Sequence, residues 1–188
     1  MTALPAIEIE DRPSLAVGAR APDFEGLLGV DGHSYALADF AHREIVVLIF
    51  SSNRCPTAKA YTQRMNDLQA SYGGRGVQLI AINSNSPYLY PEESYARMIE
   101  LAHEAGYTFP YLNDDGQRLA RAYGPTKTFH VFVLDAARRL RYPGRFDDAR
   151  VAANVRTSDL ADALDDILAD REVRVPVTRA FGCSLDLM

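Results

Sequence analysis

The stretch FSSNRCPTAKAY, residues 50–61, places Cys55 directly before a proline. The chain has 188 residues and two cysteines, Cys55 and Cys183. A cysteine reacts as its thiolate, which attacks peroxides and disulfides, and surroundings that lower the thiol pKa increase the thiolate fraction. The residues on either side of Cys55 predict such surroundings.

The position predicted for Cys55 is the start of a helix. EIVVLIF, residues 44–50, is a continuous apolar run, typical of a strand that is buried on both faces of a sheet. Pro56 suits the first turn of a helix, where its missing N–H is not needed. Four apolar side chains then recur on one helical face before two glycines end the helix: Tyr61, Met65, Leu68 and Tyr72. Cys55 would therefore face the positive end of the helix dipole, which lowers a thiol pKa.

Ser52 and Arg54 are the two neighbours expected to stabilise a Cys55 thiolate. The hydroxyl of Ser52 would donate a hydrogen bond to the sulfur, and Arg54 would add positive potential. The alternative is that Cys55 is a small buried apolar side chain, as most free cysteines are. Cys183, in RAFGCSLDLM near the C-terminus, also has two interpretations: it either packs beside Phe181 or resolves an oxidised Cys55.

Composition argues against several classes of function. The chain has 20 Lys and Arg against 25 Asp and Glu, a net charge of −5 that offers no basic surface for nucleic acid. No apolar run reaches the roughly eighteen residues of a membrane span, and residues 1–15 lack a signal-peptide pattern. With so few cysteines, these features predict a cytoplasmic protein that contacts no membrane. The histidines are too dispersed to hold a metal, and no cofactor is expected.

The other elements alternate between strands and helices in one predicted domain, residues 1–188, which ends in a tail, residues 171–188. VQLIAIN predicts a strand parallel to the first, and residues 92–106 predict a second amphipathic helix. HVFVLD and RLRYPG predict an antiparallel hairpin. A last helix, with Thr157 as its N-cap, would turn its aspartates, Asp166 among them, toward water. This order predicts an α/β fold in which helices flank a central mixed β-sheet.

Sequence pieces spread along the chain match a known pattern, in order: GARAPDF, DGHSYALADF, VVLIFSSNRCPTAKAY, AINSN, PEES, FPYLNDDGQRLARAYG, VFVLD, RYPGRFDD and FGCSL. They resemble the redoxin group of the thioredoxin-like superfamily, which includes alkyl hydroperoxide reductase-like and thiol-specific-antioxidant-like proteins. The resemblance implies a thioredoxin-like fold and an antioxidant or thiol oxidoreductase activity. Its partners would be a small peroxide or a thiol or disulfide substrate, together with an external thiol reductant.

Two positions differ from the patterns of such proteins. Ser52 stands where many carry the first cysteine of a Cys-x-x-Cys pair, so no thiol exchange can occur within this motif. Phe129 stands where they place a cis-proline. A cis bond before phenylalanine would cost about 2.5–4 kcal/mol, which predicts a trans bond and a substrate groove partly filled by the aromatic ring. Ser52, Cys55 and Pro56 resemble part of the peroxiredoxin pattern instead.

The sequence therefore supports two hypotheses about function. In the first, the protein is a single-cysteine, peroxiredoxin-like thiol oxidoreductase: Cys55 attacks a peroxide or a disulfide, and Cys183 or an external thiol resolves the product. In the second, the protein is a non-catalytic thioredoxin-like binding module that has lost the dithiol motif and the cis-proline.

Overall fold

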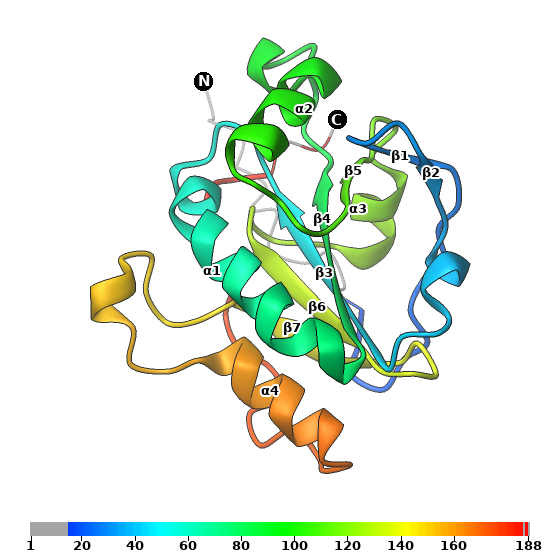
Figure 1. Cartoon of the computed structure of the whole chain (residues 1–188), viewed down its shortest axis with the longest axis vertical. Helices are drawn as coiled ribbons and strands as arrows, with labels where there is room; N and C mark the ends of the chain where they lie inside the picture. The colour runs from blue at the N-terminus through cyan, green and yellow to red at the C-terminus, as the bar shows by residue number, and fades with distance from the viewer. Residues whose placement is uncertain (1–14, 186, 188) are drawn as a thin grey trace, which may run out of the picture.

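The computed structural model describes residues 15–185 and 187. Residues 1–14, 186 and 188 lie outside the described part, and with them nearly all of the N-terminal stretch that lacks a signal-peptide pattern. Within the described part, seven strands form one mixed sheet in the order β2-β1-β5-β4-β3-β6-β7 (Figure 1). The strands are β1 (Leu27–Gly29), β2 (Ser34–Tyr35), β3 (Ile45–Ser51), β4 (Val77–Asn83), β5 (Tyr111–Asn113), β6 (His130–Leu134) and β7 (Leu140–Gly144).

Strands β3 and β4 form the centre of this sheet, and every residue of both is buried. They pair in parallel from Ile45 with Val77 to Ser51 with Asn83. β5 pairs in parallel with β4, whereas β6 and β7 form an antiparallel hairpin beside β3. The predicted buried strand, its parallel partner and the hairpin are thus confirmed. A strand as uniformly apolar as β3 is stable only where both faces of the sheet are covered.

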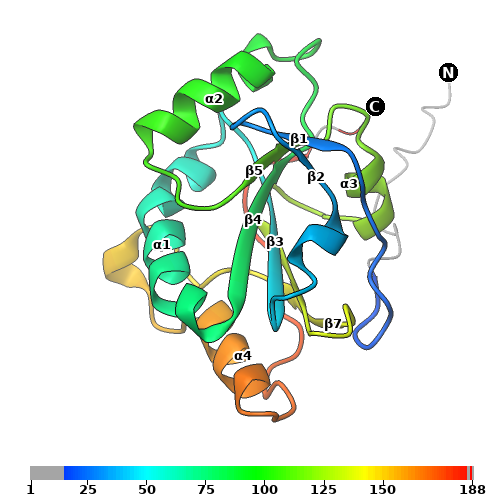
Figure 2. The same cartoon turned by 45° about the vertical axis from the view of Figure 1, so that its right-hand side comes forward.

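The described residues form four α-helices: α1 (Pro56–Tyr72), α2 (Tyr95–Glu104), α3 (Arg118–Tyr123) and α4 (Asp159–Leu168). Helices α1, α2 and α4 bury their apolar side chains against one face of the sheet. The opposite face is covered by α3 and by the 3₁₀ turn η1 (Leu37–Phe40), as Figure 2 shows. This is the predicted thioredoxin-like α/β arrangement. None of the described helices is both long and apolar enough to cross a membrane.

Helix α1 begins where the sequence predicts. Pro56 is its first residue, and Cys55 is its N-cap in an extended conformation. Tyr61, Met65 and Leu68 lie on the buried side of the helix, as their spacing requires. Cys55 therefore lies at the carboxyl end of β3, where the chain turns directly into the helix.

The predicted start of α4 and the predicted exposure of its aspartates need correction. The N-cap is Ser158 rather than Thr157. Asp166 does not face water; its side chain is buried and accepts hydrogen bonds from Arg171 and Arg174. The chain folds back after the helix, and two guanidinium groups compensate the charge of the buried carboxylate.

Helix α2 begins at Tyr95, later than the predicted residue 92. Residues Pro91–Glu93 form a separate 3₁₀ turn, η3, instead of the first helical turn. The turn buries the side chain of Glu93, which is 2% exposed. The residues after α4 return along the molecule to the end where α1 begins, so the C-terminal tail, drawn in orange-red to red, lies near the start of that helix (Figures 1 and 2).

Candidate active site

Cys55 is buried at the junction of β3 and α1, with only 2% of its surface exposed. Its backbone N–H donates to the Ser52 hydroxyl oxygen at 3.1 Å, and the N–H of Arg54 donates to the same oxygen at 3.2 Å. Ser52 therefore holds the short turn that precedes the helix. This fixes the orientation of the backbone on which the Cys55 sulfur is carried.

The proton of the Ser52 hydroxyl goes to the carboxylate of Glu93. The predicted donation of this proton to the Cys55 thiolate is therefore wrong. A buried carboxylate is a stronger acceptor than a thiolate, and Glu93 would be left with an unsatisfied oxygen if Ser52 turned away. Ser52 thus acts on Cys55 through the backbone.

Glu93 is the residue that sequence reasoning missed. Its second carboxylate oxygen accepts the N–H of Asn53 at 2.8 Å and the side-chain amide of Asn83 at 3.0 Å. The side chain of Asn53 in turn accepts the hydroxyl of Tyr111 at 2.8 Å. These bonds join the turn before α1 to β4, β5 and η3. In the sequence, Glu93 belonged to the helix predicted over residues 92–106, and the piece PEES was one of those that carry the family resemblance.

Cys183 lies beside Cys55, although neither forms a disulfide in this structure. The tail that carries it is held by a backbone hydrogen bond of 2.9 Å from the N–H of Thr128 to the carbonyl of Cys183. At Gly182 the tail passes so close that an added Cβ would lie 2.0 Å from the Thr128 carbonyl oxygen. The ring of Phe181 lies 6.4 Å from that of Tyr61. Cys183 thus packs against the core, as one interpretation held, and also places its thiol at Cys55, as the other requires.

The two thiols have opposite acidities. Burial raises the pKa of Cys55, but hydrogen bonds from the Cys183 thiol and from the N–H groups of Ala58, Cys183 and Thr57 outweigh it, so the pKa is lowered overall. Burial and the neighbouring Cys55 raise the pKa of Cys183. Cys55 is therefore the more acidic thiol of the pair, and the Cys183 thiol is the hydrogen-bond donor to its sulfur. The predicted effect of the helix start on Cys55 corresponds to the contributions that the N–H groups of Thr57 and Ala58, in the first turn of α1, make to the lowered pKa.

Arg54 extends into solvent and stacks on Tyr90, with its guanidinium carbon 3.7 Å from the ring centroid. Its charge contributes to lowering the pKa of Cys183, against the larger effects of burial and of Cys55. The positive potential of Arg54 was predicted to act on Cys55. In the structure, the acidity of Cys55 is explained by hydrogen bonds, and the electrostatic effect of Arg54 is found at Cys183.

The bond before Phe129 is trans, as predicted, because the described residues contain no cis peptide. The ring of Phe129 does not fill the substrate groove; it is buried in the core, 4.4 Å from Tyr61 and 6.0 Å from Phe146 between ring centroids. Its N–H donates to Phe50 in β3 at 2.5 Å, with φ at 73°. The space beside Thr128 is instead occupied by the C-terminal tail.

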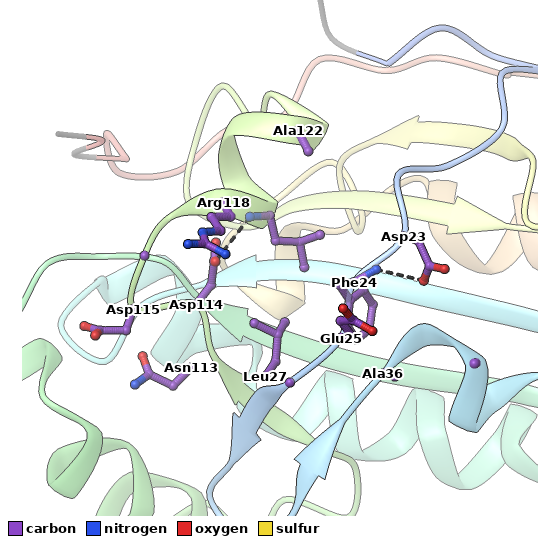
Figure 3. A pocket seen from close by; sticks show the side chains of 14 residues that line it. Asp23, Phe24, Glu25, Leu27, Ala36, Asn113, Asp114, Asp115, Arg118 and Ala122 are labelled. Carbon is purple, nitrogen blue, oxygen red and sulfur yellow. Dashed lines mark hydrogen bonds between the residues drawn. The ribbon is translucent and has the colours of Figure 1, made fainter.

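A separate hollow of about 740 Å³ lies between β1 and α3, and none of its lining residues is a cysteine (Figure 3). Asp23 and Glu25 line one side of it, and Asp115 and Arg118 line the other (Figure 3). Asp114 at its base accepts backbone N–H groups of α3 and the Ser84 hydroxyl, so its role is to fasten the helix. Within the described residues, no group of three acidic, cysteine or histidine side chains could hold a metal ion.

Comparison with known proteins relates the chain to redox proteins. A sequence model of the AhpC/TSA family matches residues 17–143. The thiol-disulfide oxidoreductase ResA of Geobacillus kaustophilus is 32% identical over 127 residues, which cover 66% of this chain and 67% of that protein. ResA of Geobacillus thermodenitrificans is 30% identical over 125 residues, 66% of this chain and 67% of that protein.

Two solved structures are similar over nearly the whole chain. A hypothetical protein from Sinorhizobium meliloti 1021 is 35% identical with a TM-score of 0.86, over 93% of this chain and 96% of that one. An uncharacterized conserved protein from Geobacillus kaustophilus is 33% identical with a TM-score of 0.87, over 94% of each chain. The peroxidoxin BcpB of Mycobacterium tuberculosis, at 18% identity and a TM-score of 0.59, covers 82% of this chain and 95% of its own and shares the fold. The matched family region ends before Cys183.

Proposed function

Because the chain belongs to the AhpC/TSA family, we propose that it is a thiol oxidoreductase that cycles between a dithiol and a disulfide joining Cys55 to Cys183. The observation that carries the proposal is the contact between the two thiols, made by a tail that is held against Thr128. Cys183 thereby takes the place of the first cysteine of a Cys-x-x-Cys motif, which in this chain is Ser52. The names of the ResA relatives support a cycle of this kind.

The oxidant that fits the site is a small hydroperoxide. Cys55 is 2% exposed and lies under the tail, so the in-line approach of a bulky protein disulfide to its sulfur is blocked. A peroxide is small enough to reach the sulfur with a slight movement of the tail. The lowered pKa of Cys55 supplies the thiolate that this reaction needs.

The first step is oxidation of Cys55. Its thiolate attacks the protonated oxygen of the hydroperoxide, the S–O bond forms as the O–O bond breaks, and the leaving alkoxide takes a proton from the solvent. The product is a sulfenic acid on Cys55. The N–H groups of Thr57 and Ala58, in the first turn of α1, favour this step because they contribute to the lowered pKa of Cys55.

The second step is resolution by Cys183. Its thiol loses a proton and attacks the Cys55 sulfur; the S–S bond forms, the S–O bond breaks, and the hydroxide that leaves takes that proton to become water. Arg54 assists because its charge favours the thiolate of Cys183. Ser52 could not perform this step, because it has a hydroxyl in place of a thiol and cannot form a disulfide.

The proposal is tested with stoichiometric hydrogen peroxide and mass spectrometry of the intact protein and its peptides. We expect the wild type to form an intramolecular Cys55–Cys183 disulfide, and the Cys183→Ser variant to form a sulfenic acid on Cys55 that dimedone traps. An exposed model thiol in the same tube serves as the control for active peroxide. If Cys55 stays reduced in both proteins while the model thiol is consumed, the proposal is wrong and a non-catalytic binding module takes its place.

A further inference from the structure

We propose that Arg54 makes this protein selective for anionic thiols as its reductant, and that these thiols attack the sulfur of Cys183. The inference rests on the proposed disulfide cycle and names the substrate class of its reductive half. Three features support it: the unequal exposure of the two cysteines, the fixed position of the Arg54 charge, and the absence of a described carboxylate that pairs with this charge.

Cys183 is the accessible sulfur of the pair. It is partly exposed, whereas Cys55 is buried beneath the tail. A reductant thiolate that attacks Cys183 breaks the S–S bond, and Cys55 leaves with the electron pair as the more acidic thiol, which makes it the better leaving group. A second reductant thiolate then attacks the reductant sulfur of the mixed disulfide. Cys183 leaves and takes up a proton, and the two reductant thiols end as a disulfide.

Arg54 is held in place rather than free to sample solvent. Its guanidinium lies 3.7 Å from the centroid of Tyr90, a contact typical of cation–π pairs. The N–H of Tyr90 is bonded to the Ser86 carbonyl at 3.0 Å, which holds the backbone that carries the ring. On the other side, the backbone N–H of Arg54 is bonded to Ser52 at 3.2 Å. The charge is therefore fixed next to the pair, where it already acts on Cys183.

Two other arginines stack on tyrosines, and their charges are neutralised. Arg64 stacks on Tyr61 and forms an ion pair with Asp147. Arg75 stacks on Tyr72 at the other end of α1 and forms an ion pair with Asp165 at 3.1 Å.

Arg54 differs from both, because no ion pair joins it to any carboxylate in the part of the chain that the structure describes. Its uncompensated positive charge attracts an approaching anion and repels a cation.

The test compares three thiols of the same length and different charge: mercaptoethanesulfonate, mercaptoethanol and aminoethanethiol. The protein with its Cys55–Cys183 disulfide is mixed with each thiol, and the reduction rate is measured for wild type, Arg54→Gln and Arg75→Gln. Dividing each variant's rate by the wild-type rate removes the intrinsic reactivity of the probes. Arg75→Gln is the matched control, since it removes the same charge from a similar stack that lies away from the cysteines.

We expect Arg54→Gln to lower the rate with the anionic thiol about threefold and to raise it with the cationic thiol by a similar factor, as one partly screened charge predicts. Arg75→Gln should change neither rate. In about 1 M salt, where the screening length is about 3 Å, the difference between wild type and Arg54→Gln should disappear. Equal effects of the two substitutions, or a ratio of Arg54→Gln to wild-type rate that is the same for all three probes, would overturn the proposal.

A second arm does not depend on the disulfide. The Cys55→Ser variant keeps Cys183 as its only thiol, and its reaction with the anionic disulfide dithiobis(nitrobenzoate) is compared with that of neutral dithiodipyridine, with and without Arg54→Gln. Loss of the anion preference in the double variant supports the role of Arg54, even if peroxide fails to join the two cysteines and the proposed function is wrong. A preference unchanged by Arg54→Gln contradicts that role, whatever the fate of the proposed function.

Discussion

Replacing Gly182 with alanine should separate the two thiols while leaving the core intact. The new Cβ would lie 2.0 Å from the Thr128 carbonyl oxygen, whereas ordinary contacts begin at 3.4 Å, so the backbones must move apart by about 1.4 Å. That movement breaks the 2.9 Å bond between Thr128 and Cys183. The lost bond costs about 0.5–1.5 kcal/mol. The φ of +153° at this position, unfavourable for alanine, adds about 1–3 kcal/mol.

A combined cost of about 2 kcal/mol or more shifts the docking of the tail by about thirtyfold, because each 1.4 kcal/mol is a factor of ten. We expect Gly182→Ala to form the Cys55–Cys183 disulfide about thirtyfold more slowly after stoichiometric peroxide, measured by quenched mass spectrometry. Dimedone labelling of Cys55 should rise correspondingly. The control is Gly74→Ala, since a Cβ at Gly74 meets nothing within 4 Å. Disulfide formation by Gly182→Ala within twofold of the wild-type rate would refute the account of how the tail is held.

Three further predictions follow from single contacts. The pH midpoint of Cys55 alkylation by iodoacetamide should lie below the free-thiol pKa of about 8.5. Cys183→Ala should raise this midpoint, because the Cys183 thiol donates to the Cys55 sulfur. A midpoint unchanged by Cys183→Ala would contradict this. Phe129→Pro should lower the free energy of unfolding in urea by at least about 2 kcal/mol rather than open a substrate groove. The substitution removes the N–H that donates to Phe50, and proline cannot adopt the φ of 73° found at this position. A variant as stable as the wild type would show the reasoning to be wrong. Hydrogen bonds from Arg174 and Arg171 lower the pKa of Asp166 to about 2 from 3.8, so its stabilising contribution is complete above pH 3.8 and is lost as the pH falls through about 2. The stability difference between wild type and Asp166→Asn, followed by thermal unfolding, should therefore shrink between pH 3.8 and about pH 2. A constant difference over this range would contradict the prediction.

The position of Cys55 was determined by the sequence alone. The apolar run of β3 requires burial on both faces, and Pro56 after it begins a helix, so Cys55 had to lie at a helix start. Both signals are local, because the spacing of apolar residues and the geometry of proline determine the backbone conformation of only a few neighbouring residues. The fold could be predicted for the same reason, since each strand and helix carries its own pattern and their order leaves few topologies.

The partners of Cys55 were decided only by the tertiary structure. Ser52 bonds to Glu93, 41 residues away in the sequence, and no local pattern indicates that a carboxylate in the turn η3 will be buried there. The approach of Cys183 depends on the path of the tail past Thr128, and Arg54 is positioned by Tyr90 from another loop. Such contacts arise when surfaces distant in sequence pack together. The periodicity of a segment determines which of its faces is buried, whereas only the packed structure determines which residue it meets.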